Sequence, residues 1–156
     1  MIRTVLHDPN PELRIVSQPV AAERILSTDM PKLIKDLLET MEEENGVGIA
    51  APQIGVHERI IIAETDDGPR PFFNPEITER SFKMVESEEG CLSVPGKWGF
   101  VKRHRSVTVT AKDDKNEDVV IKAEGLLAII FQHEIDHLDG ILFIDRAEKM
   151  SKASKM

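Results

Sequence analysis

Residues 124–140 read EGLLAIIFQHEIDHLDG, and this stretch predicts the centre of the fold. Its first half is apolar almost all the way round a helix of 3.6 residues per turn, which is typical of a helix buried inside a domain. Gly140 is a residue type that commonly ends a helix at its carboxyl terminus. We therefore expect a helix from about Glu124 to Leu138, with the rest of the chain packed around it.

The second half of this helix carries two histidines four residues apart, with Glu134 between them. Residues at this spacing project from the same side of a helix, so His133 and His137 can reach one ion while Glu134 handles a proton. A pair of helix histidines with solvated charges is the alternative interpretation. Here the pair ends an apolar stripe, where histidines need polar partners, and we favour metal ligation.

A catalytic metal site of this kind needs a third protein ligand and an open position for water. A downstream carboxylate would give a metal-dependent endopeptidase, but only Asp139, Asp145 and Glu148 follow the helix. Cys91, the one cysteine, lies in a turn-forming setting; by itself it would be interpreted as an inert buried side chain. Beside the histidine pair, a thiolate ligand is the stronger interpretation. Two imidazoles and a thiolate suit Fe(II), Zn(II), Co(II) or Ni(II).

The bulk composition is that of one ordinary globular domain. The chain has 156 residues, of which 40% are hydrophobic and 31% charged. No apolar run approaches the roughly 18 residues needed to cross a bilayer, and no signal-peptide pattern precedes the domain. We expect no membrane association and a cytoplasmic location. The net charge of −8 argues against general nucleic-acid affinity, and no direct DNA binding is expected.

Periodicity elsewhere predicts an α+β fold, with antiparallel β-sheets packed around the buried helix of the C-terminal half. An earlier helix is expected from Asp29 to Asn45, with Asp29 at its N-cap. Runs rich in β-branched and aromatic residues, separated by turn residues, predict strands. Their ranges are 59–64, 71–73, 77–84, 106–112 and 118–123. Residues 1–156 are interpreted as a single domain, in which 145–156 form a short basic tail.

A segment rich in small residues lies between Gly46 and Gln53. Its spacing excludes the dinucleotide fingerprint and the phosphate-binding loop, because the third glycine and the Gly-Lys-Ser/Thr sequence are missing. Small residues indicate a close backbone approach by another strand or by a peptide substrate. A turn that ends a helix and leads into an edge strand explains them equally well.

Three segments of the chain, taken in order, resemble the peptide deformylase family. They match the family's Gly-x-Gly-x-Ala-Ala-x-Gln, Glu-Gly-Cys-x-Ser and Gln-His-Glu-x-Asp-His-x-x-Gly patterns. The matching ranges are 46–53, 89–93 and 132–140, and the resemblance extends from Leu6 to about Ile144. It implies a catalytic domain that hydrolyses the N-formyl group from the formyl-methionine of nascent polypeptides and releases formate.

The resemblance also implies one divalent metal ion. The implied ligands are Cys91, His133 and His137. Fe(II) is the expected native ion, with Zn(II), Ni(II) or Co(II) as substitutes. Asp136, on the same helix, would either accept a hydrogen bond from a ligand histidine or pair with Arg103 or Arg105.

The remaining roles implied by the resemblance concern catalysis and substrate. Glu134 would complete the deprotonation of water and pass the proton to the departing amine. The backbone N–H of Leu92 and the side-chain amide of Gln53 would stabilise the oxyanion. The residues expected to contact substrate are Val47, Gly48, Gly90, Leu126, Ile129 and Ile130. Plain core packing is the alternative for the aliphatic ones.

The basic tail suggests a further partner. Its cationic residues are Arg146, Lys149, Lys152 and Lys155. A solvated end of the chain is the ordinary explanation, and contact with the ribosome is the functional one. Besides deformylation, two functions stay open at this point: a metal-dependent endopeptidase, and a non-catalytic metal-binding protein associated with the ribosome.

Overall fold

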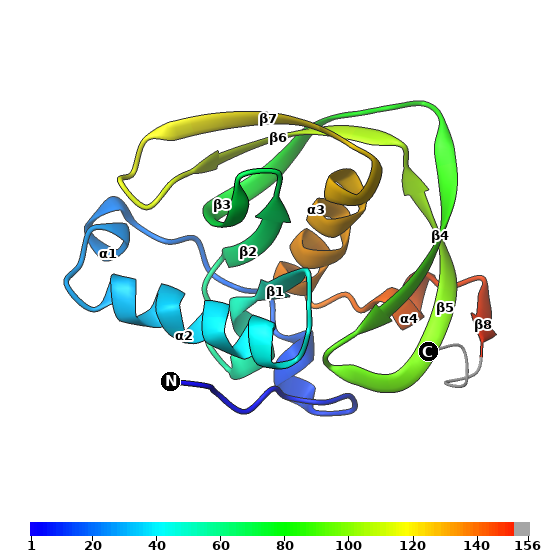
Figure 1. Cartoon of the computed structure of the whole chain (residues 1–156), viewed down its shortest axis with the longest axis horizontal. Coiled ribbons are helices and arrows are strands. Elements are labelled where there is room, and N and C mark those ends of the chain that lie inside the picture. The colour runs from blue at the N-terminus through cyan, green and yellow to red at the C-terminus, as the bar shows by residue number, and fades with distance from the viewer. Residues whose placement is uncertain (152–156) are drawn as a thin grey trace.

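Helix α3 (Gly125–Leu138) lies between two antiparallel sheets, as Figure 1 shows. The structure is a computed structural model, and it describes residues 1–151. Ala128, Phe131 and Leu138 of α3 are completely buried, so the helix is enclosed by the core as its apolar run predicts. The helix bounds and the α+β class expected from the sequence are confirmed. Gly140, at φ 75°, ends α3 in the left-handed conformation.

The larger sheet has five strands in the order β1-β2-β3-β6-β7. The strands are β1 (Gly48–Ala50), β2 (Ile60–Thr65), β3 (Gly68–Arg80), β6 (Ser106–Lys112) and β7 (Asp118–Glu124). Side chains alternate along β6, where Val107 and Val109 are buried while their neighbours are partly exposed. Phe72 of β3 packs edge-on against Phe131 of α3 at 5.0 Å between ring centroids. This sheet therefore supplies one wall of the core around α3.

The smaller sheet has three strands in the order β4-β5-β8. The strands are β4 (Met84–Cys91), β5 (Val94–His104) and β8 (Lys149–Ser151). The expectation of separate strands at 71–73 and 77–84 was wrong, because β3 is continuous and a turn at 81–83 separates it from β4. The sequence predicted none of the three strands of this sheet. Charged residues fill β4 and a Pro-Gly pair opens β5, so neither has the β-rich pattern.

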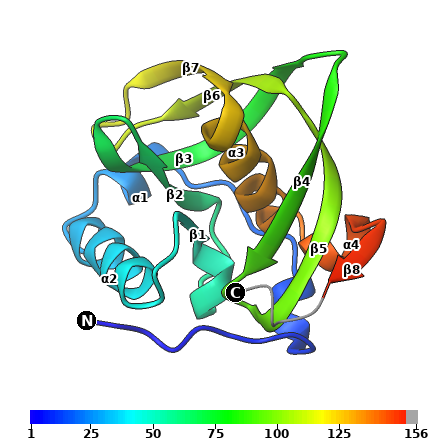
Figure 2. The ribbon, with the colours of Figure 1, turned by 45° about the vertical axis from the view of Figure 1, so that its right-hand side comes forward.

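The helices outside the core are η1 (Pro11–Arg14), α1 (Ala22–Ile25), α2 (Met30–Glu43), η2 (Ala51–Ile54) and α4 (Phe143–Arg146). Of these helices, α2 lies against β1 and β2 of the larger sheet, as the rotated view in Figure 2 shows, whereas α4 packs on β4 and β5 of the smaller sheet. Helix α2 confirms the expected helix, and Asn45 follows it at φ 57°. Asp29 occupies the N-cap position, but its side chain caps no backbone N–H and pairs with Arg24 instead. Helix α2 thus depends on its buried apolar face.

A buried carboxylate on α2 binds the N-terminal segment. Asp36 accepts hydrogen bonds from Arg3 Nε at 3.0 Å, from the amino group of Met1 at 2.8 Å and from Lys32 Nζ at 3.2 Å. The hydrogen bond from the Met1 amino group, followed by those from the two side chains, holds the pKa of Asp36 well below its usual range. We refer to Asp36, Met1, Arg3 and Lys32 as the Asp36 cluster.

The basic tail is partly built into the fold. Arg146 ends α4, and Lys149 lies in β8, which pairs with β5. Lys152 and Lys155, two of the four cations expected in the tail, lie outside the described residues. Within residues 1–151 no helix combines the length and apolar character needed to span a membrane.

Candidate active site

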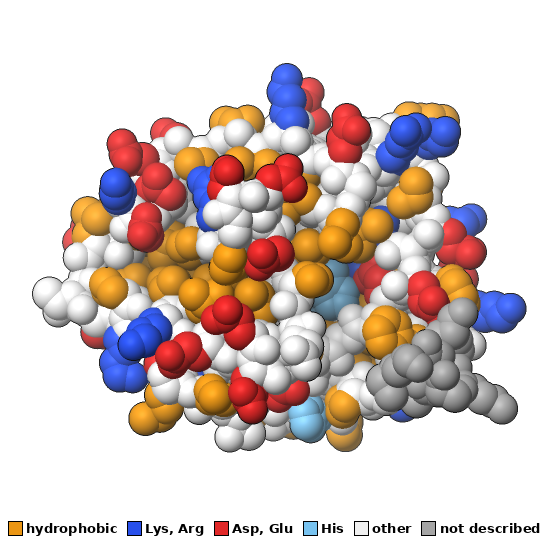
Figure 3. Space-filling view, viewed as in Figure 1, with side chains coloured by type: hydrophobic (Ala, Val, Ile, Leu, Met, Phe, Trp, Pro, Cys, Tyr) orange, Lys and Arg blue, Asp and Glu red, His pale blue; other side chains and the backbone are white. Residues whose placement is uncertain are grey.

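A cavity of about 560 Å³ lies between α3, β1 and the connected strands β4 and β5. A histidine is visible at the bottom of a hollow in the space-filling view (Figure 3). The residues expected to contact substrate all line this cavity: Val47, Gly48, Gly90, Leu126, Ile129 and Ile130. So do Gln53, Cys91, Leu92, His133 and Glu134. The volume lies in the range of small-molecule and peptide pockets.

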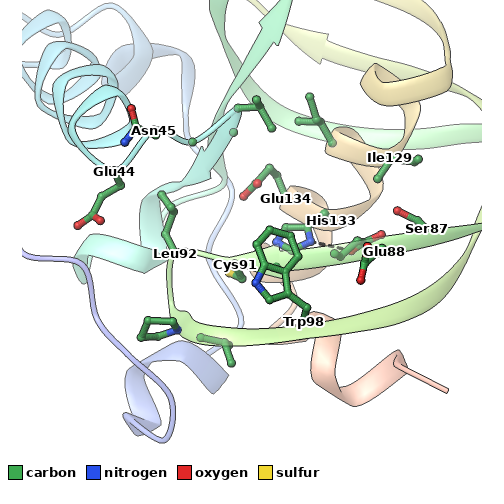
Figure 4. Close-up of a pocket in the computed structure, with 18 of the residues that line it drawn as sticks. Glu44, Asn45, Ser87, Glu88, Cys91, Leu92, Trp98, Ile129, His133 and Glu134 are labelled. Carbon is green, nitrogen blue, oxygen red and sulfur yellow. Dashed lines mark hydrogen bonds and ion pairs between the residues drawn. The ribbon is translucent and has the colours of Figure 1, made fainter. Parts of the chain in front are cut away.

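Three metal-ligating side chains converge beside the cavity. Helix α3 presents His133 and His137 one turn apart. Cys91 ends β4 and lies near His133 in the close-up (Figure 4). One ligand atom from each residue lies within 4.8 Å of the other two, and Cys91 Sγ is 3.2 Å from His137 Nε2. The sulfur also accepts hydrogen bonds from the Ser93 N–H at 3.4 Å and from Gln53 Nε2 at 3.7 Å. A sulfur surrounded by donors suits a thiolate, so the set fits a divalent transition metal.

The two histidines have opposite electrostatic surroundings. Burial lowers the pKa of His137 well below its usual value, and the positive charges of His133 and Arg103 lower it further. Burial also disfavours the charged form of His133, but hydrogen bonds with Cys91 and Glu89 outweigh it and raise its pKa well above the usual value. His133 thus occupies a place that favours a positive charge, which is also what a metal cation needs.

Glu89, whose role the sequence analysis missed, orients one of the histidines. His133 Nδ1 donates to Glu89 Oε1 at 2.9 Å, so its Nε2 is the nitrogen left to bind an ion. Arg103 donates to both oxygens of Glu89 at 2.8 Å. Burial alone would raise the pKa of Glu89, but the hydrogen bonds from Arg103 and His133 lower it to about 2. The carboxylate is therefore charged whenever it holds the ring.

Asp136 extends this chain of charges to the surface. It accepts from Arg103 Nη1 at 2.9 Å, and from Arg146 Nε at 2.7 Å and Nη2 at 3.1 Å. Of the alternatives considered for Asp136, the structure shows the pairing with Arg103. We refer to Glu89, Arg103, Asp136 and Arg146 as the Glu89 network. It connects the exposed end of α4 to a ligand histidine.

Glu134 is a buried carboxylate beside the cavity. Burial raises the pKa of Glu134 to about 7, with the nearby positive charge of His133 acting in the opposite direction. Its Oε1 atom is buried and has no hydrogen-bond partner among residues 1–151. A Cβ atom on Gly48 would lie 2.8 Å from Glu134 Oε2 and 2.9 Å from Ile130 Cγ2. Glu134 therefore occupies the side of Gly48 where a side chain would project, and the expected approach of a peptide substrate stays a prediction.

Gln53 and Leu92 flank the metal-ligating group. The Gln53 side chain is fixed at both ends, because Oε1 accepts from the Ala50 N–H at 2.9 Å and Nε2 donates to Ser93 Oγ at 3.1 Å. Leu92 lies in the turn that joins β4 to β5, one residue after Cys91. Both residues border the cavity, and their expected role as oxyanion donors stays a prediction. Ser93, which contacts Gln53 and the Cys91 sulfur, was not singled out from the sequence.

Trp98 is a second residue of the cavity that the sequence did not indicate. Its indole lies in front of Cys91 and His133 in the close-up (Figure 4). A Cβ atom on Gly90 would lie only 3.1 Å from its ring carbons, so Gly90 makes room for the indole. The interpretation that Gly90 admits a peptide backbone stays a prediction. Trp98 was missed because its contact with Gly90 arises from the pairing of β4 with β5.

Comparisons with known proteins agree with this geometry. The family model described as polypeptide deformylase matches residues 2–153. The peptide deformylase of Carboxydothermus hydrogenoformans is 43% identical over 146 residues, which cover 94% of this chain and 93% of that protein. The peptide deformylase of Natranaerobius thermophilus is 46% identical over 132 residues, which cover 83% and 85%.

Solved structures give the same result. A class I type b peptide deformylase from Acinetobacter baumannii superposes with a TM-score of 0.91 and 39% identity, covering 94% of this chain and 99% of that one. A structure of the enzyme from the same organism with Met-Ala-Ser bound gives a TM-score of 0.89 at 37% identity, covering 94% and 98%.

Proposed function

Because the chain belongs to the polypeptide deformylase family, it removes the N-formyl group from the formyl-methionine of nascent polypeptides, and we propose how its residues perform this hydrolysis. One observation supports the proposal most directly. A sulfur and two imidazole nitrogens lie within 4.8 Å of one another, next to a buried glutamate in a pocket of peptide size. This arrangement contains what metal-assisted amide hydrolysis requires.

In this proposal Cys91, His133 and His137 hold one divalent cation. When bound, the cation supplies Lewis acidity and lowers the pKa of a water molecule from 15.7 toward about 7. Soft sulfur with imidazole disfavours Mg and Ca and suits Fe(II), Zn(II), Ni(II) or Co(II). Among these we propose Fe(II) as the native ion, because it is the one that the family resemblance implies. Glu89 keeps the His133 ring in the orientation that points Nε2 at the sulfur.

Glu134 carries the proton in this mechanism. Its carboxylate takes the proton of the attacking water and then gives it to the amine nitrogen that leaves. A pKa of about 7 suits both transfers, because the group can accept and release a proton near neutral pH. Gly48 leaves the space in which Glu134 is held.

Two hydrogen-bond donors stabilise the negative charge that develops on the formyl oxygen. They are the backbone N–H of Leu92 and the side-chain amide of Gln53. Gln53 is pre-oriented by Ala50 and Ser93, so its amide needs no rearrangement during the reaction. Loss of one such donor typically costs roughly 2.7–4 kcal/mol of transition-state stabilisation.

The substrate would lie along β1. This strand is an edge of the five-stranded sheet, so a peptide can add to it by backbone hydrogen bonds. We propose that Val47, Leu126, Ile129 and Ile130 surround the methionine side chain. Val47 and Leu126 are exposed in the free protein, which favours a binding role over core packing for these two. The bound Met-Ala-Ser of the Acinetobacter baumannii structure supports a site for a short peptide.

The test of this mechanism is the Glu134→Ala variant. We expect formate release from a formyl-Met-Ala-Ser peptide to fall by about 10²- to 10⁴-fold, because the proton carrier is lost. Metal content, measured by atomic absorption, should stay at one ion per chain, since the three ligands remain. Release of formate at the parental rate would refute the role of Glu134.

The endopeptidase alternative is not favoured. Its candidate ligands are engaged elsewhere: Asp139 pairs with Arg59, Asp145 with Arg14 and Glu148 with Lys102. A purely non-catalytic role is not favoured either, because the family consists of hydrolases.

We also propose that the enzyme acts in the cytoplasm and that Lys152 and Lys155 of the tail contact the ribosome. Truncation after Ser151 tests this contact, because it leaves Arg146 bound to Asp136 and β8 paired with β5. Sedimentation with ribosomes should weaken while turnover of a short formyl peptide stays constant. Unchanged sedimentation would refute the contact.

A further inference from the structure

The turn that joins β3 to β4 exposes a large apolar side chain completely. Phe82 is the most exposed large hydrophobic residue in the described part of the chain, and Met84 beside it is 40% exposed. In Figure 1 this turn lies at the upper right, at the end of β4 far from the pocket. A single exposed aromatic side chain is ordinary on a flexible loop, but hydrogen bonds hold this turn in place.

Backbone and side-chain hydrogen bonds fix the turn against the β5–β6 connection. Ser81 N donates to Ser106 O at 2.9 Å, and Arg105 N donates to Lys83 O at 3.0 Å. Ser81 Oγ donates to Lys83 O at 2.8 Å and accepts from Ser106 N at 3.1 Å. The backbone that carries Phe82 is therefore fixed, so little backbone entropy is lost when a partner binds this turn.

Three cations lie in the backbone segments that form and support this turn. Arg80, Lys83 and Arg105 are exposed, and none of them forms an ion pair within residues 1–151. Lys and Arg side chains gather at this corner in Figure 3. Residues 80–84 and 104–106 contain no acidic residue; the nearest carboxylates are Glu79, next to Arg80, Glu86 on β4, and Glu124, which pairs with Ser106 across β6 and β7. In a chain of net charge −8, this corner is a local exception.

We propose that Arg80, Phe82, Lys83 and Arg105 form a contact site for single-stranded RNA, which we name the Phe82 corner. The cations bind phosphates, and the phenyl ring stacks on an unpaired base. The net charge argues against general affinity for nucleic acid, so we expect the contact to be confined to this corner and sensitive to salt.

The position of the corner leaves the active site free. Strand β4 leads from Met84 at the corner to Cys91 at the metal ligands, roughly 23 Å at about 3.3 Å per residue. An anionic membrane is the less favoured partner, because a broad lipid surface would also repel the acidic remainder of the chain. A narrow RNA segment can touch the corner alone.

The test measures fluorescence anisotropy of a labelled oligouridylate of about ten nucleotides, with full-length protein at about 50 mM salt. Phe82→Ala should weaken binding by about ten-fold, through loss of stacking. Lys83→Gln should lower the slope of log K against log salt by about 0.7, through loss of one phosphate contact. Formate release from a short formyl peptide should stay unchanged in both variants, which separates this proposal from the proposed mechanism.

Two matched controls lie on the β6–β7 hairpin. Val120→Ala removes an exposed apolar side chain, and Lys115→Gln removes an exposed charge; neither should change RNA binding. Equal RNA affinity of Phe82→Ala and the parent would overturn the proposal. So would binding to phosphatidylglycerol vesicles that depends on Phe82 when binding to the RNA does not.

Discussion

The Glu89 network and the Asp36 cluster are both built around a buried carboxylate that accepts hydrogen bonds from an arginine, but their partners differ in exposure. The side chains of Glu89 and Arg103 are 5% and 4% exposed. Asp36 is equally buried, whereas Lys32 is 65% and Arg3 37% exposed. If its carboxylate is lost, Arg103 keeps a charge buried in the protein, while Lys32 and Arg3 can turn toward water. The burial of the remaining partner therefore decides how much stability is lost when an ion pair is broken.

The largest expected effect follows from Glu89→Ala. Removal of this carboxylate leaves the buried Arg103 with Asp136 as its remaining acidic partner and frees the His133 ring. We expect a loss of about 3–5 kcal/mol in the free energy of unfolding. We also expect Co(II) affinity to fall by about 10- to 100-fold, because the carboxylate orients a ligand. Denaturant unfolding of the metal-free protein and Co(II) titration measure the two effects separately.

Glu89→Gln is the matched control, since it keeps an acceptor oxygen for one neighbour. Its losses should fall between those of the parent and of Glu89→Ala. A Co(II) affinity of Glu89→Ala within two-fold of the parent would contradict the role assigned to the Glu89 network.

An intermediate effect is expected for Asp36→Asn. Loss of the charged acceptor should lower the free energy of unfolding by about 1–3 kcal/mol at neutral pH, without changing Co(II) affinity. Because the folded pKa lies below the usual value of 3.8, the charged group stabilises the fold above about pH 4, and this stabilisation is lost as pH falls further. The difference between parent and variant should therefore shrink below about pH 4. Urea unfolding across that range checks it, and a constant difference would argue against the charge.

The smallest effect is expected for Arg146→Ala. Arg146 is 46% exposed, so loss of its ion pair with Asp136 should cost less than about 1 kcal/mol. Co(II) affinity should change by less than about three-fold, because Arg103 still holds Glu89. A change as large as that of Glu89→Ala would show that the network acts on the metal site along its whole length.

The parts of the molecule set by local pattern could be predicted from the sequence. Helical periodicity places His133, Glu134 and His137 on one side of α3, and alternation along 106–112 and 118–123 marks β6 and β7. The lone Cys91 was assigned by the chemistry that two imidazoles still require. Each of these inferences needs only the spacing of residues that are close in sequence, or the number of ligands that a metal site requires.

The parts that depend on distant pairing could not be predicted. The three-stranded sheet joins β4 and β5 to β8 near the C-terminal end of the chain. Its strands contain Pro, Gly and runs of charged residues, a composition that is more typical of loops. The roles of Glu89, Arg103 and Trp98 appear only after those strands pair. The adjacency of Glu89 to Gly90-Cys91 was the available signal, but it does not state which histidine the carboxylate meets.

The ligands reach the site from different halves of the fold: Cys91 from the smaller sheet, and His133 and His137 from the helix packed on the larger one. A bound cation is consequently a cross-link between two structural units as well as a reagent. Removal of the cation by a chelator should then loosen β4 from α3 and expose the β4–β5 hairpin to proteases. The resistance of the folded protein to proteolysis should therefore depend on how tightly it retains the cation.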